Sequence, residues 1–214
     1  MSNTIKLPFF PLGIVAYPGE LVNLHIFEPR YRQLFSELKK GVLSSFVMVT
    51  VLNGKLMGRG TELELTAVAK TYQSGEMDIT ALGLRPVEVD GFSESLPDKL
   101  YPGGKIKYPA FSATTEDREL TSKLRESCAE LMLALSIHRP LPPLGHPCFS
   151  FEVGHRIGMS VEQEYTLLTI DDESDRQRYL LGAIRESLAA AKKTIDMKRK
   201  IQQNGHFRYL KSDF

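Results

Sequence analysis

The spacing of apolar residues changes once along this chain of 214 residues, near residue 113. Before that point, apolar residues run or alternate in short segments bounded by turn residues, as in 46–52 and 61–72, which is typical of strands. After it, apolar residues recur at helical intervals: Leu120, Leu124, Cys128, Leu131 and Leu135. The pattern predicts an α+β protein in two parts, with a mostly antiparallel β domain over 1–112, an α-helical bundle over 113–204 and a tail over 205–214.

Residues 7–41 carry the strongest local signals. Leu7 to Ala16 is almost wholly apolar, Pro18-Gly19 is a turn signal, and 21–27 alternates as a half-buried strand does. Pro29 suits the first position of a helix, where no N–H is needed, and Gly41 suits its end. The apolar face of this predicted helix consists of Tyr31, Leu34, Phe35 and Leu38.

The same segment resembles the start of the LON domain, the amino-terminal substrate-recognition domain of Lon proteases. The matching blocks are Phe10-Pro11-Leu12, Tyr17-Pro18-Gly19 and the nine residues 24–32, LHIFEPRYR. Tyr17 stands where the family usually has Phe. Weaker matches follow at Gly58 to Leu63, similar to an I-G-T strand, and at Gly83-Leu84-Arg85.

The resemblance implies a PUA-like β domain followed by a helical domain. It also implies a binding protein that recognises exposed apolar or unfolded polypeptide, with a groove between the two parts as the expected site. The phosphate-binding pattern G-x-x-x-x-G-K-[ST] is missing from the sequence. Ser36 and Lys39 match the S-x-x-K spacing of some hydrolases, but they fall inside the predicted helix without the accompanying motifs. The expectation is therefore a non-enzymatic protein without a catalytic residue or cofactor.

The composition of the chain limits the kinds of partner that it is expected to bind. The formal net charge of +1 does not favour a polyanion, and the two cysteines form no C-x-x-C pair. The sequence shows no amino-terminal signal segment and no long apolar run, which predicts a cytoplasmic protein that does not span a membrane. The predicted partners are polypeptide substrates or a partner protein, and a homo-oligomer is also an open expectation.

The LHIFEPRYR block allows two interpretations. The favoured one is a buried polar joint that fixes the helix to the sheet through charge-assisted hydrogen bonds, with Phe27 and Tyr31 as packing residues. The alternative is a binding site. Its candidate residues, with the preceding aromatic, are Tyr17, His25, Phe27, Glu28, Arg30, Tyr31 and Arg32.

Basic residues gather in the last predicted helix, expected over 174–203. They are Lys192, Lys193, Lys198, Arg199 and Lys200. Such a stripe suits an RNA-binding module, which is the alternative function. The favoured interpretation is that these cations lie at the negative end of a long helix, because no aromatic residues are interleaved with them.

The remaining predictions concern the second half and one strand. Pro86 predicts an edge or a bulge in its strand, and Thr114 or Thr115 is expected to cap the helix that follows. Short helices are expected over 149–157 and 161–168, after an extended proline-rich connector over 138–147. His138, His146, Cys148 and His155 match no standard ligand spacing, so no metal site is predicted.

Overall fold

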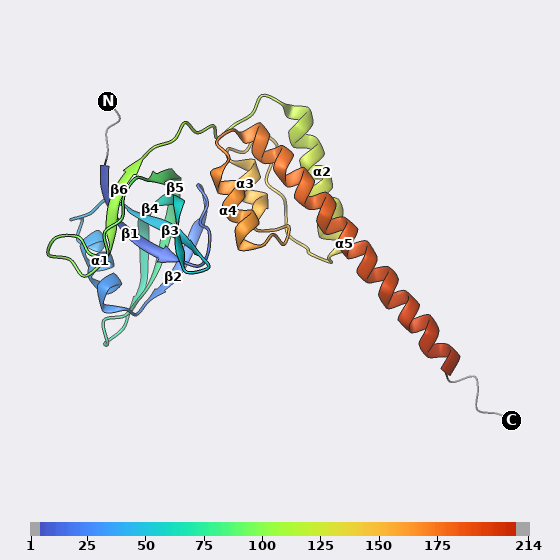
Figure 1. The fold of residues 1–214 in the computed structure, drawn as a ribbon, viewed down its shortest axis with the longest axis horizontal. Coiled ribbons are helices and arrows are strands. Elements are labelled where there is room, and N and C mark those ends of the chain that lie inside the picture. Colours follow the sequence, from blue (N-terminus) through green and yellow to red (C-terminus); the bar gives the residue numbers. More distant parts are fainter. Residues whose placement is uncertain (1–4, 209–214) are drawn as a thin grey trace.

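The protein consists of a β-rich unit and a helical unit that lie beside each other, with one long helix projecting away from both (Figure 1). The computed structural model describes residues 5–208, with side chains through residue 190 and at Lys193. The mixed α+β architecture predicted from the sequence is confirmed. The separate boundaries at 112 and 204 stay a prediction.

Six strands form one sheet. They are β1 (Ile5–Leu12), β2 (Leu21–Ile26), β3 (Phe46–Leu52), β4 (Lys55–Thr71), β5 (Met77–Val89) and β6 (Gly103–Lys107). Their order is β2-β5-β4-β3-β1-β6, and β6 also pairs with β5. Five strands therefore close into a small barrel, and β2 is attached to β5 on the outside. All pairings are antiparallel except β1 with β3.

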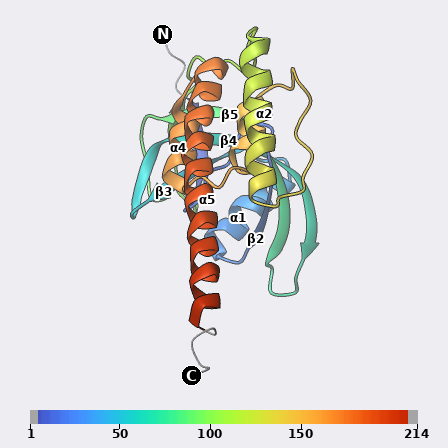
Figure 2. The same ribbon diagram turned by 90° about the vertical axis from the view of Figure 1, so that its right-hand side faces the viewer.

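Five helices complete the fold. They are α1 (Pro29–Lys39), α2 (Arg118–Ala134), α3 (Phe149–Gly154), α4 (Val161–Thr169) and α5 (Glu173–Arg208). Helix α1 belongs to the β-rich unit, and α2 and α5 run side by side in the helical unit (Figure 2). Helix α5 continues through Gly205 beyond the expected end near Gln203. A single glycine costs only about 1 kcal/mol in a helix, which does not by itself end one.

Helix α1 forms as its sequence predicts. Pro29 occupies the first turn, and Gly41 adopts a φ of 72° directly after the helix. The buried face consists of Tyr31, Leu34, Phe35 and Leu38. It packs on the barrel through edge-to-face aromatic contacts, with ring centroids 4.4 Å apart for Phe10 and Tyr31 and 5.1 Å apart for Phe35 and Phe46. Such contacts add to the burial of apolar area and fix the helix in one orientation.

Pro86 lies where β5 changes its neighbour. Residues Met77 to Leu82 pair with β2, whereas Glu88 and Val89 pair with β6. On the β4 side Pro86 lies opposite Thr61, next to a register shift between Glu62 and Leu63. The predicted bulge is therefore confirmed, because a residue without an N–H fits where the ladder is interrupted.

Aspartates cap the helices of the second unit. The carboxylate of Asp117, not Thr114 or Thr115, accepts the Leu120 N–H at 2.9 Å and caps α2. The threonine assignment is wrong because the Thr115 hydroxyl instead accepts the N–H of Asp117, at 3.1 Å, one turn ahead of the helix. At α5, the Asp172 carboxylate accepts the Ser174 N–H at 2.8 Å and caps the helix.

Candidate binding groove between the two units

Tyr17 connects the β-rich unit to the helices. It follows β1 in sequence, yet its side chain packs in the helical core and is 1% exposed. Its ring stacks on Phe151 with centroids 4.6 Å apart and lies 4.4 Å from the His155 ring. Its hydroxyl donates to the Glu164 carbonyl oxygen at 3.0 Å, and burial together with the nearby carboxylates raises its pKa well above the usual value. Tyr17 is therefore a neutral aromatic anchor between the units.

A histidine bridges two carboxylates beside this anchor. His155 Nε2 lies 3.2 Å from Glu20 Oε2, and His155 Nδ1 lies 2.7 Å from Glu164 Oε1. Burial disfavours the imidazolium, but the hydrogen bonds to Glu164 and Glu20 outweigh it and raise the pKa of His155 to about 9. The ring is therefore charged at neutral pH. Because Glu20 follows the Pro18-Gly19 turn and Glu164 lies in α4, the bridge ties the two units together.

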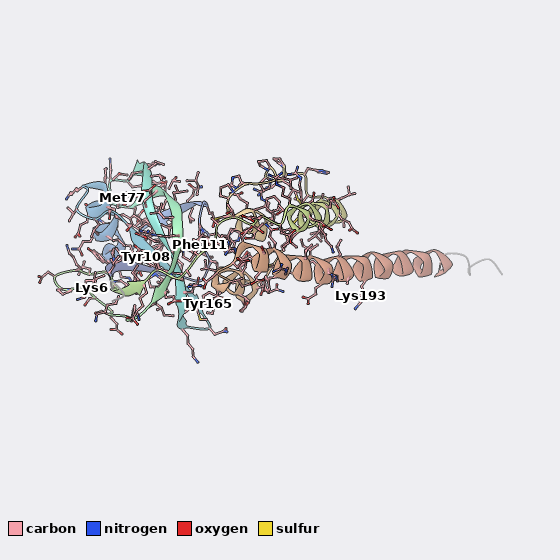
Figure 3. The ribbon with its side chains drawn as sticks, turned by 90° about the horizontal axis from the view of Figure 1, so that it is seen from above. Lys6, Met77, Tyr108, Phe111, Tyr165 and Lys193 are labelled. Atoms are coloured by element: carbon pink, nitrogen blue, oxygen red, sulfur yellow. The ribbon has the colours of Figure 1, made fainter. Side chains whose placement is uncertain are left out.

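Arg59 forms a second connection, from β4. Its backbone N–H donates to the Tyr165 hydroxyl at 3.1 Å, and its guanidinium donates to the Thr169 carbonyl oxygen at 3.1 Å and to the Asp171 carboxylate. Figure 3 shows Tyr165 between the barrel and the helices. With Tyr17 and Arg59 both held, the orientation of the helices relative to the barrel is fixed.

Two cavities lie near the junction of the two units, one of them next to Tyr17. A cavity of about 330 Å³ lies between the Tyr17–Leu21 segment and the segment from Phe151 to Arg156. A second cavity of about 430 Å³ is formed by the end of α2 and the connector, including Met132, Leu133 and Ile137 to Leu141. Arg139 lines both cavities, so they are neighbours. Together they are called the junction groove below.

The junction groove presents apolar side chains to solvent. Leu21 at one end is 61% exposed, and Leu133 at the other is 76% exposed. Charges at the rim are of both signs: the Arg156 guanidinium donates to the Glu152 carboxylate at 3.1 Å, while Glu20 and His155 form the bridge described above. Large exposed apolar side chains around a concave surface are typical of an interaction site. The mixed charges do not favour a polyanion.

Arg176 supports the wall of the groove from behind. It is fully buried, and its guanidinium lies 4.6 Å from the ring of Phe151 and 4.7 Å from that of Phe111. The same group donates to Glu173 at 2.8 Å and to the Ile170 carbonyl oxygen at 2.8 Å. Figure 3 places Phe111 where the chain passes from one unit to the other. Phe151 is therefore held between Tyr17 and a satisfied buried cation.

The buried polar joint predicted for the LHIFEPRYR block is wrong. His25 is exposed and hydrogen-bonds Asp78 across the strand pair at 2.6 Å. Arg30 donates to Glu28 at 2.9 Å with both side chains well exposed, and Phe27 is 60% exposed instead of packed. The alternation of β2 places His25 on the outer face of the sheet, and Arg30 lies off the buried face of α1.

The candidate residues consequently separate into three locations. Tyr17 lies at the junction, Tyr31 is buried in the core of the β-rich unit, and the others lie on its surface. The surface members are His25, Phe27, Glu28, Arg30 and Arg32, of which Glu28 and Arg32 are half-buried. The structure brings Tyr17 alone of these residues to the groove, and a binding role for the remainder stays a prediction.

Several groove residues were not predicted. Glu20, Leu133 and Phe151 carry no motif, and the spacing of His155 bears only on a metal site. One signal was present, because the proline-rich connector 138–147 was identified as extended, and it forms one side of the groove. The proximity of Phe151 and His155 to Tyr17 follows from packing between residues more than a hundred positions apart.

The remaining predictions concern a serine–lysine pair, a metal site and a membrane span. Ser36 and Lys39 lie in α1, where Ser36 is half-buried and Lys39 exposed. In the part of the chain that the structure describes, no group of three or more His, Cys, Asp or Glu side chains is placed to hold a metal ion. Within residues 5–208 no helix has the length and apolar character needed to cross a membrane.

The basic stretch of α5 falls largely outside the described side chains. Lys193 is described and is exposed on the projecting part of the helix (Figure 3). The side chains of Lys192, Lys198, Arg199 and Lys200 lie outside that description, so the RNA-binding alternative stays a prediction.

Comparisons with known proteins agree with the resemblance seen in the sequence. The fold is similar to the crystal structure of a Lon N-terminal domain protein from Xanthomonas campestris, with a TM-score of 0.63 and 23% identity over 83% of this chain and 98% of that chain. It is also similar to the N-terminal domain of the Mycobacterium avium complex Lon protease, with a TM-score of 0.64 and 15% identity over 85% of this chain and 98% of that chain. No curated protein sequence matches significantly.

At these identities the structural likenesses establish the fold. Family membership follows from the sequence, because the family model of the ATP-dependent protease La (LON) substrate-binding domain matches residues 6–204, nearly the whole chain. The chain belongs to the LON substrate-binding domain family.

Proposed function

We propose that this protein binds exposed apolar segments of polypeptides in the junction groove and performs no catalysis itself. The observation that carries the proposal is the groove, which combines a concave surface between two units with the exposed side chains of Leu21 and Leu133. Domain junctions are common positions for ligand sites. Family membership adds support, since the matching family is described as a substrate-binding domain.

The shape and charge of the groove favour a polypeptide over a small molecule or a nucleic acid. Its two cavities share Arg139 in their linings, and its rim carries paired charges of both signs. Covering one leucine side chain stabilises a complex by about 1.5–3 kcal/mol before the entropy of association is subtracted. Two such contacts, about 3–6 kcal/mol in all, correspond to binding no tighter than about 40 μM.

A cytoplasmic location and the lack of catalysis belong to the same proposal. Neither cysteine is disulfide-bonded, and both are buried, which suits a reducing compartment. Ser36 lies on a regular turn of α1, and the sequence lacks the motifs that would make a serine–lysine pair catalytic.

The test measures binding of a fluorescein-labelled apolar–aromatic peptide by anisotropy at low and high salt. Leu133→Asp places a charge in the groove and is expected to weaken binding about tenfold or more, because the peptide would desolvate an unpaired carboxylate. Leu100→Asp is the matched control, since Leu100 is also exposed but lies in the loop before β6.

The salt dependence of binding separates the proposed peptide binding from the alternative, RNA binding. Apolar contacts keep their strength at high salt, whereas phosphate contacts weaken steeply. Equal effects of the two substitutions would exclude the junction groove as the site. Salt-sensitive binding of single-stranded RNA without any peptide signal would favour the nucleic-acid function.

A further inference from the structure

Strand β2 has an unpaired edge. It pairs with β5 on one side, and among residues 5–208 no strand pairs with its other side. Sheet proteins commonly protect such an edge with proline, lysine or a covering segment. The sequence of β2, LVNLHI, contains neither proline nor lysine. The edge therefore presents backbone donors and acceptors that another strand can satisfy.

The pairing of β2 with β5 identifies which backbone groups face this edge. The Gly83 N–H donates to the Glu20 carbonyl oxygen at 2.9 Å, and the next pair along the strands is Leu21 with Leu82. In an antiparallel ladder, hydrogen-bonded and non-hydrogen-bonded pairs alternate. The residues whose N–H and C=O groups point away from β5 are therefore Leu21, Asn23 and His25. Within the described chain these outward groups have no hydrogen-bond partner.

The exposed side chains of this segment are arranged symmetrically about Leu24. Leu21 lies three residues before Leu24 and is 61% exposed, and Phe27 lies three residues after it and is 60% exposed. Between them, Asn23 and His25 are also exposed. In an antiparallel pairing of two identical strands centred on Leu24, Leu21 of one copy lies opposite Phe27 of the other. Each exposed apolar side chain then gains an apolar partner, which stabilises a strand pair.

The same pairing joins the backbone groups that lack partners. Asn23 lies opposite His25 of the other copy, and both residues present outward N–H and C=O groups, so they can exchange two hydrogen bonds. A register shifted by one residue sets outward groups opposite groups that are already bonded to β5. A pairing centred on Asn23 joins outward groups but sets Leu21 opposite His25. The pairing centred on Leu24 satisfies the backbone and both apolar side chains together.

This symmetry specifies a second copy of the chain as the occupant of the edge. A two-fold symmetric dimer uses one surface twice, so its contacts are reciprocal about the axis. A site for a foreign strand does not require symmetry about its own centre, and it gains specificity from pockets for alternate side chains. The two cavities of the junction groove contact β2 at Leu21 alone.

We propose that this protein forms a two-fold symmetric homodimer in which the β2 strands of two copies pair antiparallel about Leu24. The two sheets become continuous, and Leu21 of each copy packs against the partner's Phe27. Because Leu21 also lines the cavity next to Tyr17, the partner's Phe27 extends the apolar wall of the junction groove at that end. The dimer goes beyond the proposed function and does not depend on it, since its formation requires no peptide.

The dimer should be weak and should depend on concentration. One pair of strands is a small interface, and small interfaces are typical of transient complexes. We expect a dissociation constant on the order of 10–100 μM. Sedimentation velocity between about 5 and about 500 μM protein should therefore show the change from monomer to dimer.

A substitution at the edge tests whether backbone pairing holds the dimer. Asn23→Pro removes one outward N–H but none of the bonds to β5, and symmetry makes the loss occur twice in each dimer. The dissociation constant is expected to rise at least about tenfold. Asn23→Ala is the matched control and should stay within about threefold of wild type, because it also loses the 2.8 Å bond from the Thr80 hydroxyl but keeps the N–H. Circular dichroism and thermal melting check that both variants fold.

Cysteine cross-linking tests the register independently. In the proposed pairing the two Leu24 residues face each other as a non-hydrogen-bonded pair, with Cα atoms about 4.5 Å apart, a separation that a disulfide can span. The two Asn23 residues lie diagonally, about 7–8 Å apart, which is too far. Leu24→Cys should therefore form a covalent dimer under mild oxidation at least about tenfold faster than Asn23→Cys. The natural cysteines, Cys128 and Cys148, are buried.

Three outcomes would overturn the inference. The first is a wild-type protein that stays monomeric up to about 500 μM, which is above the expected dissociation constant. The second is a dimer that Asn23→Pro leaves intact and in which Leu24→Cys and Asn23→Cys cross-link equally, since the interface would then lie elsewhere. The third is a monomeric wild type whose peptide binding is weakened by Asn23→Pro but not by Asn23→Ala, which would assign the edge to a foreign segment.

Discussion

The ring of Tyr17 stacks on the ring of Phe151, with centroids 4.6 Å apart and planes inclined by 15°. Tyr17 comes from the segment after β1, and Phe151 from α3. This contact joins the two units, and both rings line the cavity that Leu21 also lines. The stability of the junction and the shape of the groove therefore depend on the same aromatic pair.

Truncation of Tyr17 should destabilise the protein strongly. Tyr17→Ala is expected to lower the free energy of unfolding by about 3–5 kcal/mol, because a fully buried aromatic side chain leaves a cavity. Tyr17→Phe keeps the stacking and loses only the bond to the Glu164 carbonyl oxygen, which contributes about 1 kcal/mol. Urea unfolding measures both. A loss below about 1 kcal/mol for Tyr17→Ala would show that the junction is not held by this ring.

The His155 bridge should make stability depend on pH in the alkaline range. The folded-state pKa of about 9 exceeds the unfolded value near 6.5, so the folded protein retains the proton. The contribution is fully present below about pH 6.5 and is lost as pH rises through about 9. Urea unfolding of wild type and His155→Gln should differ by about 1–2 kcal/mol at pH 6 and converge above pH 9.5. A difference that grows with pH would contradict this protonation.

Two arginines provide a matched comparison of exposed and buried charge. Arg30 pairs with Glu28 on the surface, where an ion pair contributes between zero and about 1 kcal/mol. Arg176 is fully buried and pairs with Glu173, so its removal leaves a buried carboxylate without its counter-ion. Arg176→Ala should cost about 3–5 kcal/mol and Arg30→Ala less than about 1 kcal/mol, measured by thermal or urea unfolding. Equal losses would restore a structural role for the LHIFEPRYR block.

The close approach of Gly83 to the Tyr17 backbone predicts a fourth effect on stability. A Cβ atom at position 83 would lie 2.1 Å from the Tyr17 carbonyl oxygen, which requires the backbone to move. Gly83→Ala should therefore destabilise the protein by about 2 kcal/mol or more. Gly58→Ala is the control, because Gly58 also lies in a strand but a Cβ there meets no atom within 4 Å. Equal melting temperatures for the two variants would contradict the predicted clash.

The sequence by itself determined the elements whose signals are local. Pro29, Gly41 and the buried spacing from Tyr31 to Leu38 defined α1, because a helix places residues three and four apart on one face. Alternation defined β2 and much of the sheet, and Pro86 indicated the interruption in β5. The LHIFEPRYR block identified the family, which the match over residues 6–204 confirms.

Only the tertiary structure decided which faces meet. The parallel pairing of β1 with β3 and the closure of the barrel by β6 join segments that no local pattern relates. The polar groups from His25 to Arg32 lie at the surface. The sequence did not reveal this, because alternation in a strand does not show which of its faces is covered. Tyr17, Phe151 and His155 meet across more than a hundred residues of chain, and their contact creates the groove. Sequence spacing records which side chains share a face, whereas burial depends on what the folded chain brings against that face.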